Sequence, residues 1–64
     1  MKAVIGDRLV VASRHVDEAR RVGVILEVHG PDGAPPYVVR WEGHTDTAVV
    51  LPGADAHVEH RPAG

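Results

Sequence analysis

The sequence predicts an all-β protein, a small five-stranded antiparallel barrel. Five short segments rich in apolar and β-branched residues alternate in polarity with a period of two, which is typical of half-buried strands. Clusters of glycine and proline, with 7 Gly and 5 Pro among 64 residues, separate these segments and indicate turns. No segment combines a full helical repeat with helix caps, so helix is not expected to dominate.

The first strand is expected at about residues 7–13, where Leu9 and Val11 share one parity. The charged segment 14–21 has apolar residues at a spacing of three, which would allow one helical turn. A long excursion between two strands is the simpler interpretation of this segment.

The second strand is expected within residues 21–30, the segment richest in β-branched residues. One parity of this segment is apolar and consists of Val22, Val24, Leu26 and Val28. Ile25 lies on the other parity, so the alternation is imperfect. Either a central strand contacted on both faces or a β-bulge explains this pattern, and Gly23 offers a place for the bulge.

A turn is expected at residues 31–36, because Pro31 suits the second position of a β-turn and Asp32-Gly33 tolerates positive φ. Two consecutive prolines end this turn and cannot donate hydrogen bonds to a sheet. The third strand therefore begins after them and covers residues 37–42.

The remaining elements follow at short intervals. The third strand places Tyr37, Val39 and Trp41 on one face. The last segments are a turn at 43–46, a fourth strand at 47–51, a 3₁₀-like turn at 52–55, a fifth strand at 56–60 and a frayed tail at 61–64.

This order of elements is the layout of an SH3-like barrel, in which five twisted strands fold over on themselves. A five-stranded OB-type barrel is the alternative, but it usually needs longer strands and an intervening helix. A chain of 64 residues has room for one domain. We therefore expect a single domain over residues 1–64, with its core at about 6–60.

The composition limits the classes of function. The chain has no cysteine, which excludes disulfides, thiolate metal sites and cysteine nucleophiles. The formal net charge of −2 differs from the strongly basic balance of proteins that bind phosphate backbones. Residues 1–5 are too short for the apolar part of a signal peptide, and no run approaches the ~20 apolar residues of a membrane span. A cytoplasmic location is expected.

Four segments together suggest a family. They are GDRLVV, GVILEV, DGAPPYVVRW and PGADAHV, and they extend from about Gly6 to Val58. In these segments the chain resembles a group of small, mostly actinobacterial proteins known as domain of unknown function nineteen-eighteen. The resemblance implies a small SH3-like barrel, in agreement with the strand pattern, and it implies no activity.

The two aromatic residues, Tyr37 and Trp41, could form a stacking platform or part of the core. Phenylalanine is absent, so these are the only large rings available to fill the interior. We expect Trp41 to anchor the core. Tyr37 is expected to be the aromatic that is more free to contact a ligand, because its hydroxyl needs water or a partner.

The polar residues do not indicate catalysis. The five histidines are His15, His29, His44, His57 and His60, and no local pair predicts the three or four converging ligands that zinc requires. The side-chain hydroxyls other than that of Tyr37 belong to Ser13, Thr45 and Thr47, and none lies in a nucleophile motif. No enzyme activity, cofactor or metal is expected, and no catalytic residue is assigned.

Arginines supply the other candidate ligand contacts. In an SH3-like layout the first excursion flanks the usual ligand groove, so Arg14, Arg20 and Arg21 could bind phosphates or acidic peptides there. Local pairing with His15, Asp17 and Glu18 is the competing interpretation. Arg40, on the opposite parity of the third strand from the aromatics, completes the set.

We therefore expect a non-catalytic binding or accessory module whose partner is a protein or peptide. A nucleic-acid-binding mini-barrel is the alternative, and no membrane partner is expected. A weak homodimer is also expected, because Val10, Val38 and Val50 would form an exposed apolar patch if they lie opposite the core.

Overall fold

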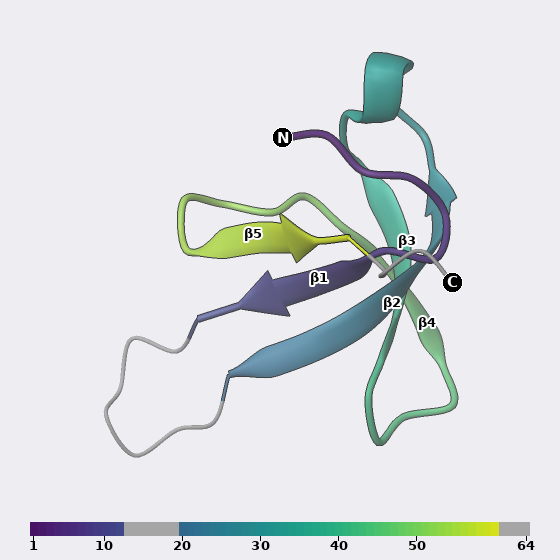
Figure 1. Ribbon diagram of the computed structural model, residues 1–64. Helices are drawn as coiled ribbons and strands as arrows, with labels where there is room; N and C mark the ends of the chain where they lie inside the picture. Colours follow the sequence, from purple (N-terminus) through teal and green to yellow (C-terminus); the bar gives the residue numbers. More distant parts are fainter. Residues whose placement is uncertain (13–19, 61–64) are drawn as a thin grey trace.

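The computed structural model describes residues 1–12 and 20–60 and shows an all-β fold, as the sequence predicts (Figure 1). The strands are β1 (Arg8–Val11), β2 (Arg21–Val28), β3 (Tyr37–Trp41), β4 (Thr47–Val50) and β5 (Ala56–Glu59). One 3₁₀ turn, η1, covers Pro31–Gly33. The helical turn considered within 14–21 falls largely, and the frayed tail wholly, outside the described residues. In the described ranges, no helix has the length and apolar character needed to cross a membrane.

The five strands form one antiparallel sheet in the order β4-β3-β2-β1-β5. The sheet is strongly twisted, so that β3 and β4 run steeply across the direction of β1 and β5 (Figure 1). Its long central strand, β2, pairs with β1 on one side and β3 on the other. Hydrogen bonds do not close the sheet into a complete barrel within the described residues, and β4 and β5 are its two edges.

A β-bulge interrupts β2, as its imperfect alternation predicts. The register with β3 shifts between Ile25, which pairs with Val39, and Glu27, which pairs with Val38. The extra residue is thus Leu26, not the predicted Gly23. The bulge moves the interior side of β2 to the other parity, so that Ile25 and Val28 both pack in the core.

Gly23 has a different role, because it allows two side chains of β3 to approach the backbone of β2. A Cβ atom at this position would lie 2.2 Å from Val39 Cγ1 and 3.0 Å from Trp41 Cε3. Gly23 pairs with Trp41 across the sheet. A larger residue would therefore push Val39 or Trp41 out of place.

The core lies on the inner face of the twisted sheet. Its buried members are Ala3, Leu9, Ile25, Tyr37 and Val39, and its partly buried neighbours are Val11, Val28, Trp41, Val50, Ala56 and Val58. The expected outer patch of Val10, Val38 and Val50 does not form. Val10 is only 2% exposed, and Val50 pairs with Tyr37 and packs against the core.

The turn after β2 ties the N-terminal segment to the core. Asp32 and Gly33 have φ values of 55° and 83°, as the turn prediction requires. The carbonyl oxygen of Gly33 accepts hydrogen bonds from the backbone N–H of Ala3, at 2.9 Å, and from the hydroxyl of Tyr37, at 2.6 Å. The 3₁₀ turn therefore lies at Pro31–Gly33, and not at 52–55, where the sequence predicts one. The predicted turn at 52–55 exists as a β-turn, closed by a 3.1 Å bond from Ala56 N–H to Gly53 O.

A buried carboxylate joins the two ends of the described chain. Asp7 is 3% exposed, and its Oδ2 atom accepts a 3.0 Å hydrogen bond from the backbone N–H of Val4. The same oxygen lies 2.8 Å from Nδ1 of His60, which follows β5. This contact links residues that are 53 positions apart and holds the start of β1 beside the end of β5.

Candidate functional site

Trp41 lies at the end of β3, on the inner face of the sheet but at the margin of the core. Its side chain is partly buried, and it forms part of the wall of three neighbouring surface depressions. We refer to these depressions together as the Trp41 site. No other residue lines all three of them.

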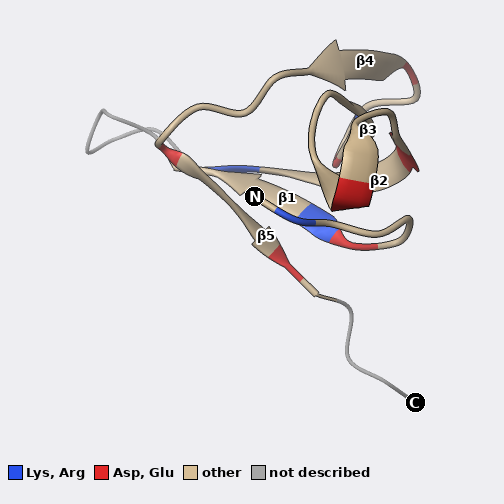
Figure 2. Ribbon diagram, turned by 90° about the horizontal axis from the view of Figure 1, so that it is seen from above, with Lys and Arg blue, Asp and Glu red and all other residues tan. Residues whose placement is uncertain are grey.

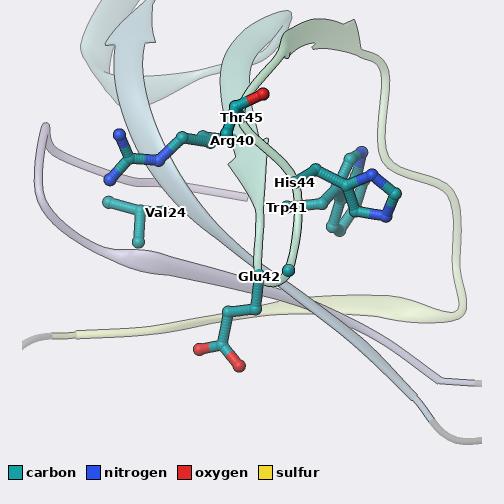
Figure 3. Close-up of a pocket in the computed structure, with 7 residues that line it drawn as sticks. Val24, Arg40, Trp41, Glu42, His44 and Thr45 are labelled. Carbon is teal, nitrogen blue, oxygen red and sulfur yellow. The ribbon is translucent and has the colours of Figure 1, made fainter.

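The first depression, of about 420 Å³, lies around the turn between β3 and β4. It is lined by Val24, Arg40, Trp41, Glu42, Gly43, His44 and Thr45. The turn is closed by a 3.0 Å hydrogen bond from His44 N–H to Trp41 O, and Gly43 adopts the positive φ of 84° that it requires. Figure 3 shows Arg40 and Val24 on one side of β3, His44 on the side of Trp41, and Glu42 pointing away.

Arg21 covers one face of the Trp41 ring. Its guanidinium carbon lies 4.1 Å from the ring centre, which is a cation–π contact. The strand register explains the contact. Trp41 pairs with Gly23, and Arg21 precedes Gly23 by two residues, so Arg21 and Trp41 are diagonal neighbours on the same face. Gly23 leaves room for the indole, because a Cβ atom at this position would lie 3.0 Å from Trp41 Cε3.

The other two depressions differ in character. One has a mixed polar and apolar lining that consists of Arg20, Arg21, Val22, Trp41, Glu42 and His44. The other is mainly apolar and is lined by Val11, Arg21, Trp41, Val50, Leu51, Pro52, Gly53, Asp55 and Ala56. Trp41 and Arg21 line both of them, so a mainly apolar depression adjoins one that contains two arginines.

The structure brings together most of the arginines that the sequence singles out. Arg20, Arg21 and Arg40 are all exposed, and each lines a depression beside Trp41. Arg20 and Arg21 reach this place from the start of β2, and Arg40 from the end of β3. Arg14 and its neighbours His15, Asp17 and Glu18 lie outside the described residues.

Tyr37 does not belong to this surface, which corrects the expected division between the aromatics. Its side chain is 0% exposed in the centre of the core, and its hydroxyl donates to Gly33 O. Burial raises the pKa of this hydroxyl above its usual value, and the negative charge of Asp7 raises it further. Tyr37 is therefore a neutral structural donor, and it presents no atom to a ligand.

The sequence interpretation did not place Trp41 and His44 together in a candidate site. Trp41 has the core parity, and only its place opposite Gly23, at the end of the strand pairing, puts it at the margin. The adjacent turn residues Glu42 and Gly43 were the available signal, because a side chain next to a turn has solvent on one side.

The described histidines are dispersed. The Nε2 atoms of His29 and His57 lie 3.1 Å from carboxylate oxygens of Glu27 and Glu59, respectively. His15 is not described. Among the described residues no group of three potential metal ligands gathers at one place.

Charged residues of both signs are distributed over the described ribbon (Figure 2). Among the strands, β1 and β3 each carry an arginine, β2 carries both an arginine and a glutamate, β5 carries a glutamate, and β4 carries no charged residue. The Trp41 site itself contains Glu42 and Asp55 as well as its arginines. The positive charge of the Trp41 site therefore comes from its own arginines and does not extend over the rest of the described surface.

Comparison with known proteins places the chain in a family. Residues 1–58 match the family described as Domain of unknown function (DUF1918). Uncharacterized protein Rv0569 of Mycobacterium tuberculosis is 48% identical over 58 residues, which cover 91% of this chain and 66% of that protein. Uncharacterized protein Mb2324 of Mycobacterium bovis is 47% identical over 60 residues, which cover 91% and 72%, respectively.

The matched part of this chain thus spans about two thirds of the length of Rv0569. No solved structure matches it. The resemblance seen in the sequence is confirmed by the family match and by both mycobacterial relatives. The chain belongs to the DUF1918 family.

Proposed function

We propose that this protein is a non-catalytic cytoplasmic module that binds an extended segment of a partner protein at the Trp41 site. The observation that carries the proposal is the position of Trp41 in the walls of both a mainly apolar depression and one that contains two arginines. A peptide can place an apolar side chain against Val11, Val50 and Pro52 while an acidic group meets Arg20 or Arg21.

The chemistry of the lining residues supports binding over catalysis. Arginine stays protonated in proteins, and the indole is a hydrogen-bond donor only. Neither group can move a proton at neutral pH. The side chains of His44 and Glu42 are both exposed to solvent at the turn.

The coverage of the Trp41 ring by Arg21 favours a peptide over a nucleic acid as the partner. Proteins that bind single strands stack bases on open aromatic faces, a contact worth ~1–3 kcal/mol per base. Here Arg21 covers one face of the ring, so a base that stacks on that face would have to displace Arg21. The formal net charge of −2 also opposes binding of a phosphate backbone.

A displayed random peptide library tests the proposal with the wild-type protein as bait. We expect enriched sequences that combine an acidic residue with a large apolar one. Their binding should shift the fluorescence of Trp41, the single tryptophan, and should be lost in Trp41→Ala. His29→Ala is the control, because His29 is exposed beyond the opposite end of β2.

A thymidine homopolymer tests the alternative in parallel. If it binds, and if its affinity falls steeply with added salt at a slope of ~0.7 per phosphate contact, the protein is a nucleic-acid-binding module and the proposal is wrong. The proposal also fails if enriched peptides bind wild type and Trp41→Ala equally well.

A further inference from the structure

The three arginines of the Trp41 site differ in their surroundings. Arg40 lines the depression around the turn between β3 and β4, and Figure 3 shows it on the other side of β3 from Trp41. Arg20 and Arg21 together line the depression with the mixed lining. Arg21 also lines the mainly apolar depression, where it is the sole basic residue among the described lining residues. Arg21 is therefore the arginine that can meet ligand groups in both of these depressions.

The contact with Trp41 restricts the side chain of Arg21 without using its hydrogen-bond donors. The guanidinium carbon lies 4.1 Å from the ring centre. Among the residues that the structure describes, the Arg21 guanidinium has neither an ion-pair partner nor a hydrogen-bond acceptor. Its five N–H donors are thus available to a ligand. Because the ring already restricts this long side chain, ligand binding costs Arg21 less conformational entropy than it costs an arginine without such a contact.

The charges around Arg21 favour a carboxylate over a phosphate as the bound group. Arg20 supplies a second guanidinium in the mixed depression, but Glu42 lines the same depression and Asp55 lines the mainly apolar one. A phosphorylated side chain carries about −1.5 to −2 charges at pH 7, whereas a carboxylate carries a single negative charge. The two acidic residues of the site therefore oppose a phosphate more strongly than a carboxylate.

We infer that Arg21 is the specificity-determining residue of the Trp41 site, and that it binds the side-chain carboxylate of an aspartate or glutamate in the partner peptide. This inference rests on the proposed function. A guanidinium group binds a carboxylate through two parallel N–H···O bonds, whereas the amide of asparagine or glutamine is uncharged and offers one acceptor oxygen. The apolar side chain of the same peptide enters the adjoining depression, against Val11, Val50 and Pro52.

A displayed random peptide library tests the inference when it is selected against three baits, namely the wild type, Arg21→Gln and Arg20→Gln. Peptides enriched by the wild type should combine an acidic residue with a large apolar one. Arg21→Gln should still enrich the apolar residue but not the acidic one. Arg20→Gln is the matched control and should keep the acidic preference. Circular dichroism would check that both variants keep the β-sheet spectrum.

Affinities of the peptides enriched by the wild type supply the second readout. Each peptide is synthesised with an amidated C-terminus, so that a terminal carboxylate cannot replace the side chain. Changing the acidic residue of the peptide to its amide should weaken binding to wild type and to Arg20→Gln about tenfold or more. The same change should alter binding to Arg21→Gln less than about twofold. A general loss of stability in Arg21→Gln would lower the affinity for both peptides and leave their ratio unchanged.

The inference is overturned if Arg21→Gln still distinguishes the acidic peptide from its amide as the wild type does, or if Arg20→Gln loses this distinction. Tighter binding of a peptide with phosphoserine at the acidic position would overturn the assignment of a carboxylate. In each of these cases, peptides that bind wild type but not Trp41→Ala leave the proposed function in place. A library that yields no peptide on the wild type overturns the proposed function and this inference together.

Discussion

The guanidinium carbon of Arg21 lies 4.1 Å from the centre of the Trp41 ring, and this contact places the single tryptophan beneath an arginine at the margin of the core. Tyr37, four residues earlier on the same face, is fully buried. The two aromatic residues of β3 thus have different roles, because Tyr37 fills the interior and Trp41 forms part of the surface.

Removing the Arg21 charge should expose Trp41 to solvent. A cation–π contact at an exposed site contributes ~0.5–1 kcal/mol, so Arg21→Gln should lower the free energy of unfolding by about this amount. The emission of Trp41 should move to longer wavelength, and acrylamide should quench it more strongly. Arg20→Gln is the matched control because Arg20 lies on the other parity. Equal quenching in the two variants would contradict the stacking.

The protein should lose stability above about pH 10. The pKa of Tyr37 is raised in the folded state from its ordinary value of 10.0, mainly by burial. The unfolded chain therefore releases this proton first as the pH rises, and folding is weakened from about pH 10 upward. Below pH 10 the hydroxyl is protonated in both states and this loss is absent.

Denaturant unfolding at several alkaline pH values, together with the absorbance titration of the single tyrosine, measures this effect. The tyrosine titration midpoint should lie higher in the folded protein than in denaturant. Tyr37→Phe should lack the tyrosine-linked part of the alkaline loss. A parallel decline in wild type and Tyr37→Phe would rule out the linkage.

Gly23→Ala should destabilise the fold, because the new methyl group would overlap Val39 Cγ1 at 2.2 Å. Overpacking of this kind typically costs ~1–3 kcal/mol. Gly53→Ala is the control, since a Cβ atom there meets no atom within 4 Å. That variant should be neutral or more stable by ~0.4–1 kcal/mol, through a less flexible unfolded chain. Thermal melts compare them, and a native-like Gly23→Ala would contradict the described packing.

The strand pattern could be predicted from the sequence because alternation reveals a half-buried sheet directly. All five predicted strands exist, with ends that differ from the expectation by at most two residues. The bulge in β2 was also visible, as a break in parity after Ile25. Its location was not, because glycine is used for bulges and for close backbone approach alike, and Gly23 serves the second purpose.

The burial of individual residues could not be predicted from the sequence of one strand, because it depends on how that strand pairs with its neighbours. Parity places Tyr37 and Trp41 on one face, but the pairing register decides which of them lies at the centre. Tyr37 faces Val28 and Val50, whereas Trp41 faces Gly23 at the margin. The fourth strand gave no usable parity, since Ala48, Val49, Val50 and Leu51 are all apolar.

The candidate site was predictable in part. Arg20, Arg21 and Arg40 were singled out because guanidinium groups bind carboxylates and phosphates. Their meeting around one tryptophan required the sheet, which brings the start of β2 beside the end of β3. His44 carried no motif, and its place in the site follows from the turn that closes β3 and β4.

The division of labour between the two aromatics is tested most directly by thermal melts of Tyr37→Ala and Trp41→Ala under the same conditions. Losing a buried aromatic costs ~3–5 kcal/mol, which is comparable to the whole stability of so small a domain. The structure predicts that Tyr37→Ala is unfolded and that Trp41→Ala, whose ring is only partly buried, still melts cooperatively at a lower temperature. A folded Tyr37→Ala variant together with an unfolded Trp41→Ala variant would contradict these roles and would mean that Trp41 is the core aromatic.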